Sequence, residues 1–269
     1  MPAEIDLSFL DDPSVLSLLF PLGYTRLSPF ASVGGRSGRP LEPSIEVEEG
    51  VRVGYGLWVG DESGPTILHF HGNGEIVDDY EWIASVYAEI GVNLFSVDYR
   101  GYGGSDGTPT FTNVLRDASV VYHACAEILR GRGLSDSLFV MGRSIGSIPA
   151  CEVAYRHQEG IRGLIVESGA ANNFRYRWLH ARPEHDDVLG DDGVFLNKVK
   201  LRHVTAPTLI IHGRMDEVVP FAEGEELYEN SAAPGKRLFA VPYAGHNDLL
   251  ALDPKGYFGA IRGLIAQYR

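Results

Sequence analysis

The chain contains a serine, an aspartate and a histidine, in that order, which together could activate a hydroxyl group. Ser144 lies in Gly142-Arg143-Ser144-Ile145-Gly146, between an apolar run and a segment with helical spacing. The pattern Gly-x-Ser-x-Gly predicts a sharp turn between a strand and a helix, which lifts the serine Oγ clear of the sheet. A serine hydroxyl is a poor nucleophile, so it needs a base within hydrogen-bond reach and an acid that orients the base.

The base predicted for Ser144 is His246. It lies in Ala244-Gly245-His246-Asn247-Asp248, directly after the last predicted strand. The acid is expected one unit earlier in the chain, where Asp216 follows the preceding strand. Glu167, at the end of the strand after the serine, is the alternative acid. An Asx turn or a helix cap is the structural alternative for Asp216.

Two backbone N–H groups are predicted to stabilise the negative oxygen that develops on a substrate carbonyl. One belongs to Ile145, at the N-terminus of the helix that follows the serine. The other is assigned to Asn73 in His71-Gly72-Asn73-Gly74-Glu75, because its glycines let the chain turn sharply and expose amides. These two amides would form the oxyanion hole of the site.

Strand-like and helix-like segments alternate through most of the chain. Besides the strand before Ser144, period-two and apolar patterns predict an antiparallel pair within 44–59 and strands at 66–71, 92–97, 161–167, 208–211 and 237–241. Helical spacing predicts helices after Ser144 and at 78–90, 112–129, 222–230 and 254–267. This order predicts an α/β fold with a mostly parallel sheet and helices on both faces, in which chemistry occurs at the carboxyl ends of the strands.

The chain is predicted to comprise an N-terminal extension, residues 1–43, and one main domain, residues 44–269. Within the extension, the apolar run in residues 12–21 predicts a short helix, with an aspartate as N-cap and a proline at each end. Apolar and charged side chains mix in residues 168–205, which are predicted to form a short partial lid over the site. An ordinary surface connection is the alternative to a lid.

Three aromatic residues are assigned to an apolar pocket for the acyl chain of a substrate. Phe174 and Trp178 come from the predicted lid, and Tyr102 comes from the loop after the strand at 92–97. His69 and His71 would project from one face of a strand, but no third ligand is evident near them. The sequence therefore predicts no metal and no cofactor.

Composition limits the classes of partner. The formal net charge of -13 argues against nucleic acid and anionic membrane surfaces, since both require concentrated positive charge. Cys125 and Cys151 fall at apolar positions of predicted helices and are expected to be buried free thiols, which fits a reducing compartment. No run is long enough to span a bilayer, so a cytoplasmic location and no integral membrane segment are expected. The oligomeric state is not predicted.

The order Ser144, Asp216, His246 resembles that of the α/β-hydrolase superfamily, over residues 44–269. The motifs most similar to the family are His71-Gly72-Asn73, Asp98-Tyr99-Arg100-Gly101-Tyr102-Gly103, Gly142-Arg143-Ser144-Ile145-Gly146 and Gly245-His246-Asn247-Asp248. Among its members, the chain resembles small hydrolase-domain proteins that include acyl-protein thioesterases and monoacylglycerol lipases. The resemblance implies an eight-stranded sheet and an acyl-enzyme mechanism.

We therefore expect a serine hydrolase that acts on small-molecule carboxylic esters or thioesters. A serine peptidase of the same architecture is the nearest alternative. A hydrolase-like binding protein without catalysis is the alternative from a different class. Enzymes of this architecture with an aspartate nucleophile are disfavoured, because Ser144 occupies the nucleophile position.

Overall fold

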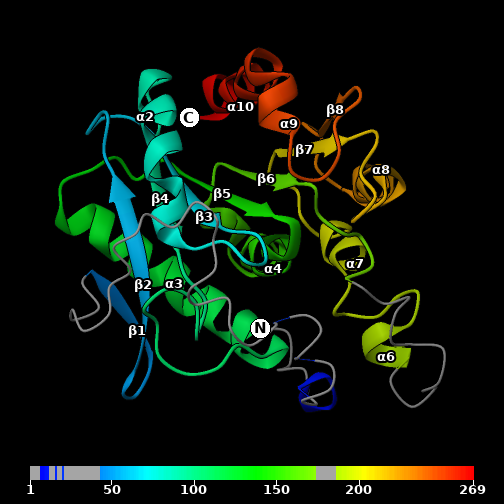
Figure 1. Ribbon diagram of the computed structural model, residues 1–269, viewed down its shortest axis with the longest axis horizontal. Helices are drawn as coiled ribbons and strands as arrows, with labels where there is room; N and C mark the ends of the chain where they lie inside the picture. The colour runs from blue at the N-terminus through cyan, green and yellow to red at the C-terminus, as the bar shows by residue number, and fades with distance from the viewer. Residues whose placement is uncertain (1–6, 12–15, 17–19, 21–42, 174–185) are drawn as a thin grey trace. The chain divides into compact units, whose positions relative to one another are not determined.

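Strands and helices alternate along the chain in the order that the sequence predicts (Figure 1). A computed structural model of the protein describes residues 7–11, 16, 20, 43–173 and 186–269. The chain divides into two compact units, residues 1–138 and 139–269. The prediction of a mostly parallel sheet of eight strands is confirmed, and four strands fall mainly in each unit.

The strands of the first unit lie in the order β1-β2-β4-β3. They are β1 (Ser44–Glu48), β2 (Val51–Trp58), β3 (Thr66–Phe70) and β4 (Asn93–Val97). β2 is antiparallel to both β1 and β4, whereas β3 and β4 are parallel. The antiparallel pair predicted within residues 44–59 is therefore confirmed.

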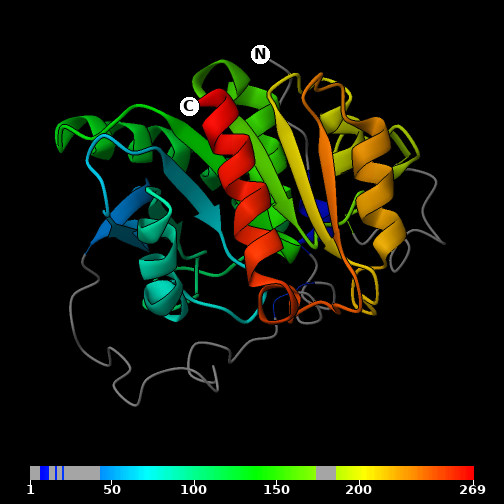
Figure 2. The same ribbon diagram turned by 90° about the horizontal axis from the view of Figure 1, so that it is seen from above.

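Helices cover both faces of these four strands, with α2 and α3 on opposite sides (Figure 2). The helical elements whose bounds the structure describes in this unit are η1 (Ser8–Leu10), η3 (Val77–Tyr80), α2 (Glu81–Glu89) and α3 (Phe111–Gly131). α3 begins after Thr110, whose Oγ1 accepts a hydrogen bond from the Asn113 N–H and so satisfies one of the free amides of the first turn. Most of the helix predicted at residues 12–21 lies outside the described residues.

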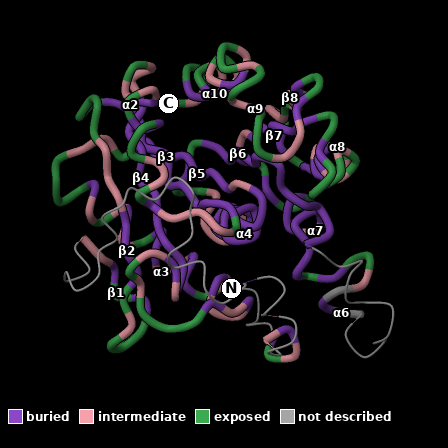
Figure 3. The backbone as a smooth tube through the Cα atoms, in the orientation of Figure 1, coloured by how far each residue is buried: buried purple, intermediate pink, exposed green. Residues whose placement is uncertain are grey.

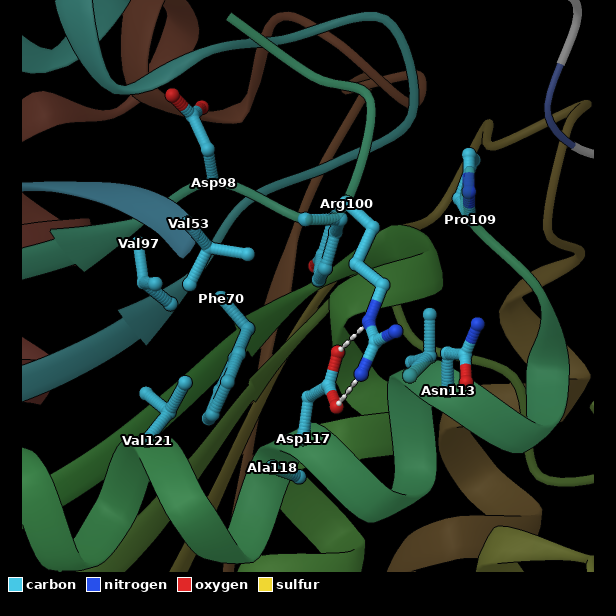
Figure 4. A pocket seen from close by; sticks show the side chains of 12 residues that line it. Val53, Phe70, Val97, Asp98, Arg100, Pro109, Asn113, Asp117, Ala118 and Val121 are labelled. Carbon is cyan, nitrogen blue, oxygen red and sulfur yellow. Dashed lines mark hydrogen bonds and ion pairs between the residues drawn. The ribbon is translucent and has the colours of Figure 1, made fainter. Parts of the chain in front are cut away.

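A small pocket lies between α3 and the strands of the first unit (Figure 4). Apolar side chains line most of it, including Val53, Phe70 and Val121. The Arg100 guanidinium points across the pocket to Asp117 on α3 and donates two hydrogen bonds, of 2.6 and 2.8 Å, to the carboxylate. The bidentate pair explains how two charges are accommodated among apolar neighbours. None of the residues predicted for the site lines this pocket.

The strands of the second unit lie in the order β5-β6-β7-β8, and all neighbouring pairs are parallel. They are β5 (Leu138–Arg143), β6 (Gly163–Glu167), β7 (Thr208–Gly213) and β8 (Arg237–Val241). The helical elements are η4 (Ser144–Gly146), α4 (Ser147–His157), η5 (Gln158–Gly160), α6 (Asp186–Leu189), α7 (Asn197–Leu201), α8 (Phe221–Asn230), α9 (Leu249–Leu252) and α10 (Pro254–Tyr268). α10 lies on one face of these strands, and α4 and α8 lie on the other (Figures 1 and 2).

Burial follows strand position within each unit (Figure 3). Every residue of β3, β4, β6 and β7 is buried, which is typical of parallel strands covered on both faces. β1 alternates and β8 is partly exposed, as expected for outer strands. The prediction that Cys125 and Cys151 are buried free thiols is confirmed, and burial raises the pKa of both. Among the described helices, none combines the length and apolar composition needed to cross a membrane.

Candidate active site

Ser144 occupies the sharp turn that its flanking glycines predict. β5 ends at Arg143, and Ser144 has a φ angle of 52°, in the left-handed region that residues other than glycine seldom adopt. A Cβ atom at Gly142 would overlap the Gly146 carbonyl oxygen and approach the Ala150 Cβ to 2.7 Å. Glycine at position 142 therefore lets the chain fold back tightly and hold the Ser144 side chain at the end of the strand.

The structure brings together the three residues that the sequence predicts for hydroxyl activation. The His246 Nε2 atom lies 2.9 Å from Ser144 Oγ, and the His246 Nδ1 atom lies 2.8 Å from Asp216 Oδ2. Ser144 follows β5, Asp216 lies between β7 and α8, and His246 lies between β8 and α9. All three belong to the second unit. They form one continuous hydrogen-bonded chain.

Asp216 is almost fully buried, and each of its oxygens has defined neighbours. Oδ1 accepts hydrogen bonds from the Val218 and Val219 amides at 2.9 and 2.8 Å. Oδ2 faces His246 and also lies 3.4 Å from His212 Nε2. Burial by itself would raise the pKa of Asp216, but the hydrogen bonds from His212, His246 and Val219 outweigh it and hold the pKa well below its usual range. The carboxylate is therefore charged throughout the neutral pH range.

The Asp216 carboxylate makes both kinds of contact that the sequence suggested, the contact with His246 and the Asx turn. Oδ1 closes the turn ahead of α8, as an Asx turn requires, and Oδ2 remains available to the imidazole. His212 is a neighbour of Asp216 that no sequence motif indicates. Its position four residues before Asp216, near the end of the buried strand β7, is the only signal that could have identified it.

Backbone contacts join the loop that carries Asp216 to the loop that carries His246. The Met215 N–H donates to the Ala244 carbonyl at 2.8 Å, and the Arg214 N–H donates to the Val241 carbonyl at 3.1 Å. A Cβ atom at Gly213 would overlap the Ala244 carbonyl oxygen. Glycine at the end of β7 thus allows the two loops to approach closely.

Glu167, the alternative acid, has other partners. Its Oε1 lies 3.3 Å from Arg143 Nε, and its Oε2 accepts the Tyr257 hydroxyl at 2.6 Å. The carboxylate that accepts the hydrogen bond from His246 Nδ1 is Asp216 instead.

The two amides predicted for the oxyanion hole come from different units. Ile145 is buried and directly follows Ser144 in η4. Asn73 lies in the loop after β3, where the Tyr102 hydroxyl donates to its Oδ1 at 2.7 Å. The Gly72 N–H donates to Glu75 at 2.6 Å, which helps to close this loop. The joint role of the Ile145 and Asn73 amides stays a prediction.

The acyl pocket also stays a prediction. Tyr102 is buried and bonded to Asn73, whereas Phe174 and Trp178 lie outside the described residues. The described parts of the lid segment include α6 and α7.

His69 and His71 have separate partners. His69 Nδ1 lies 3.0 Å from Ser96 Oγ, and His71 Nε2 lies 3.3 Å from Asp98 Oδ1. Burial disfavours the charged form of His71, but Asp98 outweighs this effect and raises the pKa of His71. Within the described part of the chain, no three His, Cys, Asp or Glu side chains are grouped so that they could hold a metal ion.

Known proteins resemble this chain in sequence over part of its length. The family model described as "Serine aminopeptidase, S33" matches residues 61–182. Alpha/beta hydrolase domain-containing protein 17B from Homo sapiens is 35% identical over an alignment of 190 residues that covers 68% of this chain and 61% of that protein. The chain thus spans about three fifths of the length of this relative.

Solved structures resemble the chain over most of its length. Est1E from Butyrivibrio proteoclasticus, with bound ferulic acid, has a TM-score of 0.66 and 19% identity, covering 84% of this chain and 98% of that chain. An esterase from Pyrococcus furiosus has a TM-score of 0.65 and 19% identity, covering 84% of this chain and 91% of that chain. These similarities confirm the fold class that was predicted from the sequence, the α/β-hydrolase fold.

Proposed function

The chain belongs to the α/β-hydrolase superfamily, and from this premise we propose that it is a serine hydrolase of carboxylic esters or thioesters, acting through an acyl-enzyme intermediate. The observation that carries the proposal is the hydrogen-bonded chain from Ser144 through His246 to Asp216. The left-handed conformation of Ser144 supports it, since strain of this kind is typical of functional sites.

In the proposed mechanism, Ser144 Oγ attacks the substrate carbonyl while His246 Nε2 takes the hydroxyl proton. Asp216 accepts the hydrogen bond from Nδ1 and stabilises the imidazolium that forms. The tetrahedral intermediate collapses, the bond to the alcohol or thiol breaks, and the imidazolium returns its proton to the leaving group. A water molecule, deprotonated by His246, then attacks the acyl carbon. The bond to Ser144 Oγ breaks, the imidazolium returns its proton to Oγ, and the acid is released.

We assign the oxyanion hole to the amides of Ile145 and Asn73. Ile145 follows the nucleophile in the short helical turn η4, so its N–H belongs to the segment that would face a developing oxyanion. The support for Asn73 is its place in the glycine-flanked motif and the Tyr102 hydrogen bond that anchors its side chain. The loss of one such donor typically costs about 2.7 to 4 kcal/mol of transition-state stabilisation.

A peptidase is the second candidate, because the matching family model is described as a serine aminopeptidase. An amide nitrogen must be protonated before it leaves, whereas phenolates and thiolates leave readily. The ester proposal therefore predicts that esters and thioesters react at least about tenfold faster, as kcat/KM, than matched amides, equivalent to about 1.4 kcal/mol. We also propose a cytoplasmic location, supported by the two free cysteines.

The test compares p-nitrophenyl esters, acyl thioesters and matched anilides of several chain lengths, together with labelling by a fluorophosphonate. Wild type should hydrolyse the esters and take one adduct. Ser144→Ala should do neither. Ser147→Ala is the matched control, because Ser147 contacts Asn197 and is expected to leave labelling intact.

Each contrary result selects another function. Faster cleavage of anilides than of esters would favour the peptidase. Wild type that is folded but neither labelled nor active would favour a binding protein without catalysis.

A further inference from the structure

Arg143 lies between the nucleophile and the loop of the base. It is the last residue of β5, directly before Ser144, and its side chain is 12% exposed. Its Nη2 atom donates to the His246 carbonyl oxygen at 3.2 Å and to Asn247 Oδ1 at 2.7 Å. A single guanidinium nitrogen, with two hydrogens, thus contacts two consecutive residues of the base loop.

The other edge of the guanidinium is held from β6. Arg143 and Glu167 are register partners on neighbouring parallel strands, and Arg143 Nε lies 3.3 Å from Glu167 Oε1. Glu167 is itself fixed by the hydroxyl of Tyr257, a buried residue of α10. The orientation of Arg143 is therefore fixed, and its charge balanced, by residues of the sheet and its covering helix.

The base loop has few other constraints of this kind. Residues 242–248 lie between β8 and α9 and belong to no strand or helix. The Gly245 N–H donates to Asp248 Oδ1 at 2.6 Å, a bond internal to the loop, and Ala244 contacts the Asp216 loop. The ring of His246 is oriented by Asp216, but its backbone carbonyl is held by Arg143.

We propose that Arg143 is a positioning residue that fixes the backbone of His246, so that its imidazole stays within hydrogen-bond reach of Ser144 Oγ. The proposal rests on the proposed function, because it assigns a role at the same site. Arg143 is covalently attached to Ser144, so its contacts tie the nucleophile directly to the base loop. A displacement of about 1 Å at such a site can reduce the rate about 100-fold.

Arginine suits this position because its donors point in two fixed directions. One edge faces a carboxylate while Nη2 faces two oxygens of the loop. A lysine ammonium keeps the charge but lacks the planar fork, so it cannot hold both directions at once.

The first experiment measures kcat and KM of Arg143→Gln on an ester substrate. We expect kcat to fall about 10- to 100-fold with little change in KM, because the base is misplaced while substrate binding is retained. Arg143→Lys should lie between Arg143→Gln and wild type. Fluorophosphonate labelling should slow by the same factor as kcat.

Arg156→Gln is the matched control. Arg156 is also a partly buried arginine paired with a glutamate, Glu152, but its partner lies on the same helix α4. This variant should keep the kcat of wild type. If Arg143→Gln is as active as Arg156→Gln, the proposal is overturned.

A pH profile separates positioning from a general structural role. Among the described residues, the charged or titratable groups around the His246 ring and loop are Asp216, with His212 beyond it, Arg143, with Glu167 beyond it, and Tyr243 and Asp248 within the loop. Glu167→Gln leaves the Arg143 cation uncompensated, which disfavours a second positive charge on the nearby imidazole and should shift the acid limb of kcat/KM to lower pH. Arg143→Gln leaves the Glu167 carboxylate uncompensated and should shift the limb to higher pH. Equal profiles in both variants would contradict the proposal.

Two further measurements keep the outcomes distinct. If Arg143→Gln does not fold, Asn247→Ala replaces it, since Asn247 is exposed and its loss removes one acceptor of Nη2. A fall in kcat of about threefold at constant KM supports the proposal, and an unchanged kcat overturns it. Wild type without activity or labelling would refute the proposed function itself, whereas active wild type with fully active variants would refute only the role of Arg143.

Discussion

Asp216 and Glu167 are buried carboxylates at the carboxyl ends of neighbouring parallel strands, and their surroundings differ. Glu167 is the last residue of β6 and is register partner to Ile211 of β7, whereas Asp216 lies in the turn beyond β7. Asp216 accepts hydrogen bonds from two backbone N–H groups and faces two histidines. Glu167 faces a guanidinium and a tyrosine hydroxyl.

Under the proposed mechanism, the partner of each carboxylate, rather than its place on the sheet, distinguishes the two roles. The turn beyond β7 extends Asp216 toward the imidazole and lets its second oxygen close the turn. Glu167 remains at the strand end, where it can reach the neighbouring strand and Arg143. In the proposed mechanism, Asp216 acts directly on the base, His246, and Glu167 acts on Arg143, which is proposed to hold the loop of the base.

The largest expected effect separates these two roles. Asp216→Asn should reduce kcat about 10⁴-fold with little change in KM, because the amide no longer stabilises the imidazolium or its correct tautomer. Glu167→Gln should reduce kcat less than about tenfold, since it weakens only the support of Arg143. Steady-state kinetics on one ester substrate measure both. A large loss in Glu167→Gln with a small loss in Asp216→Asn would reverse the comparison.

Much of the fold follows from local patterns in the sequence. The predicted strand and helix boundaries agree with the structure to within two residues for β6, β7 and α3. The predicted helix at 78–90 is instead a 3₁₀ turn, η3, followed by the shorter helix α2. The chain from η3 to α2 keeps helical spacing, so apolar periodicity cannot distinguish the two geometries.

The site is predictable where its signal is local. The sharp turn at Ser144 is predictable from the two glycines around the serine. The position of His246 is predictable because it comes directly after a glycine at the end of a predicted strand. Arg143 occupies the variable position of its motif, so no pattern indicated its contacts with a loop more than 100 residues later. Such contacts depend on side-chain direction in three dimensions, which periodicity does not specify.

The acid stability of the protein gives the next prediction. The pKa of Asp216 is lowered in the folded state, so its contribution is complete above the unfolded pKa of about 3.9 and is lost as pH falls toward the folded pKa. Below about pH 4 the unfolded chain takes up a proton at Asp216 that the folded chain does not. Urea unfolding from pH 6 to pH 3 should therefore show a steeper loss of stability in wild type than in Asp216→Asn. Parallel slopes would mean that the carboxylate is not stabilised by its contacts.

The smallest expected effect on activity concerns Tyr257, whose hydroxyl donates a hydrogen bond to Glu167. Tyr257→Phe removes the hydroxyl that donates to Glu167 Oε2 and leaves this buried oxygen short of one donor. A hydrogen bond to a charged group contributes about 1.5 to 3 kcal/mol, so the free energy of unfolding should fall by about that amount. The kcat should change less than about threefold, because Arg143 keeps its contacts with Glu167 and with the His246 loop. Tyr268→Phe is the control from the same helix, where the hydroxyl accepts a hydrogen bond from the exposed side chain of Gln267, and it should cost less than about 0.5 kcal/mol. Urea unfolding measures both variants, and equal losses would show that the Tyr257 hydroxyl does not stabilise Glu167. Combined with Glu167→Gln, Tyr257→Phe should add little further loss, because two residues that act through one contact are not additive.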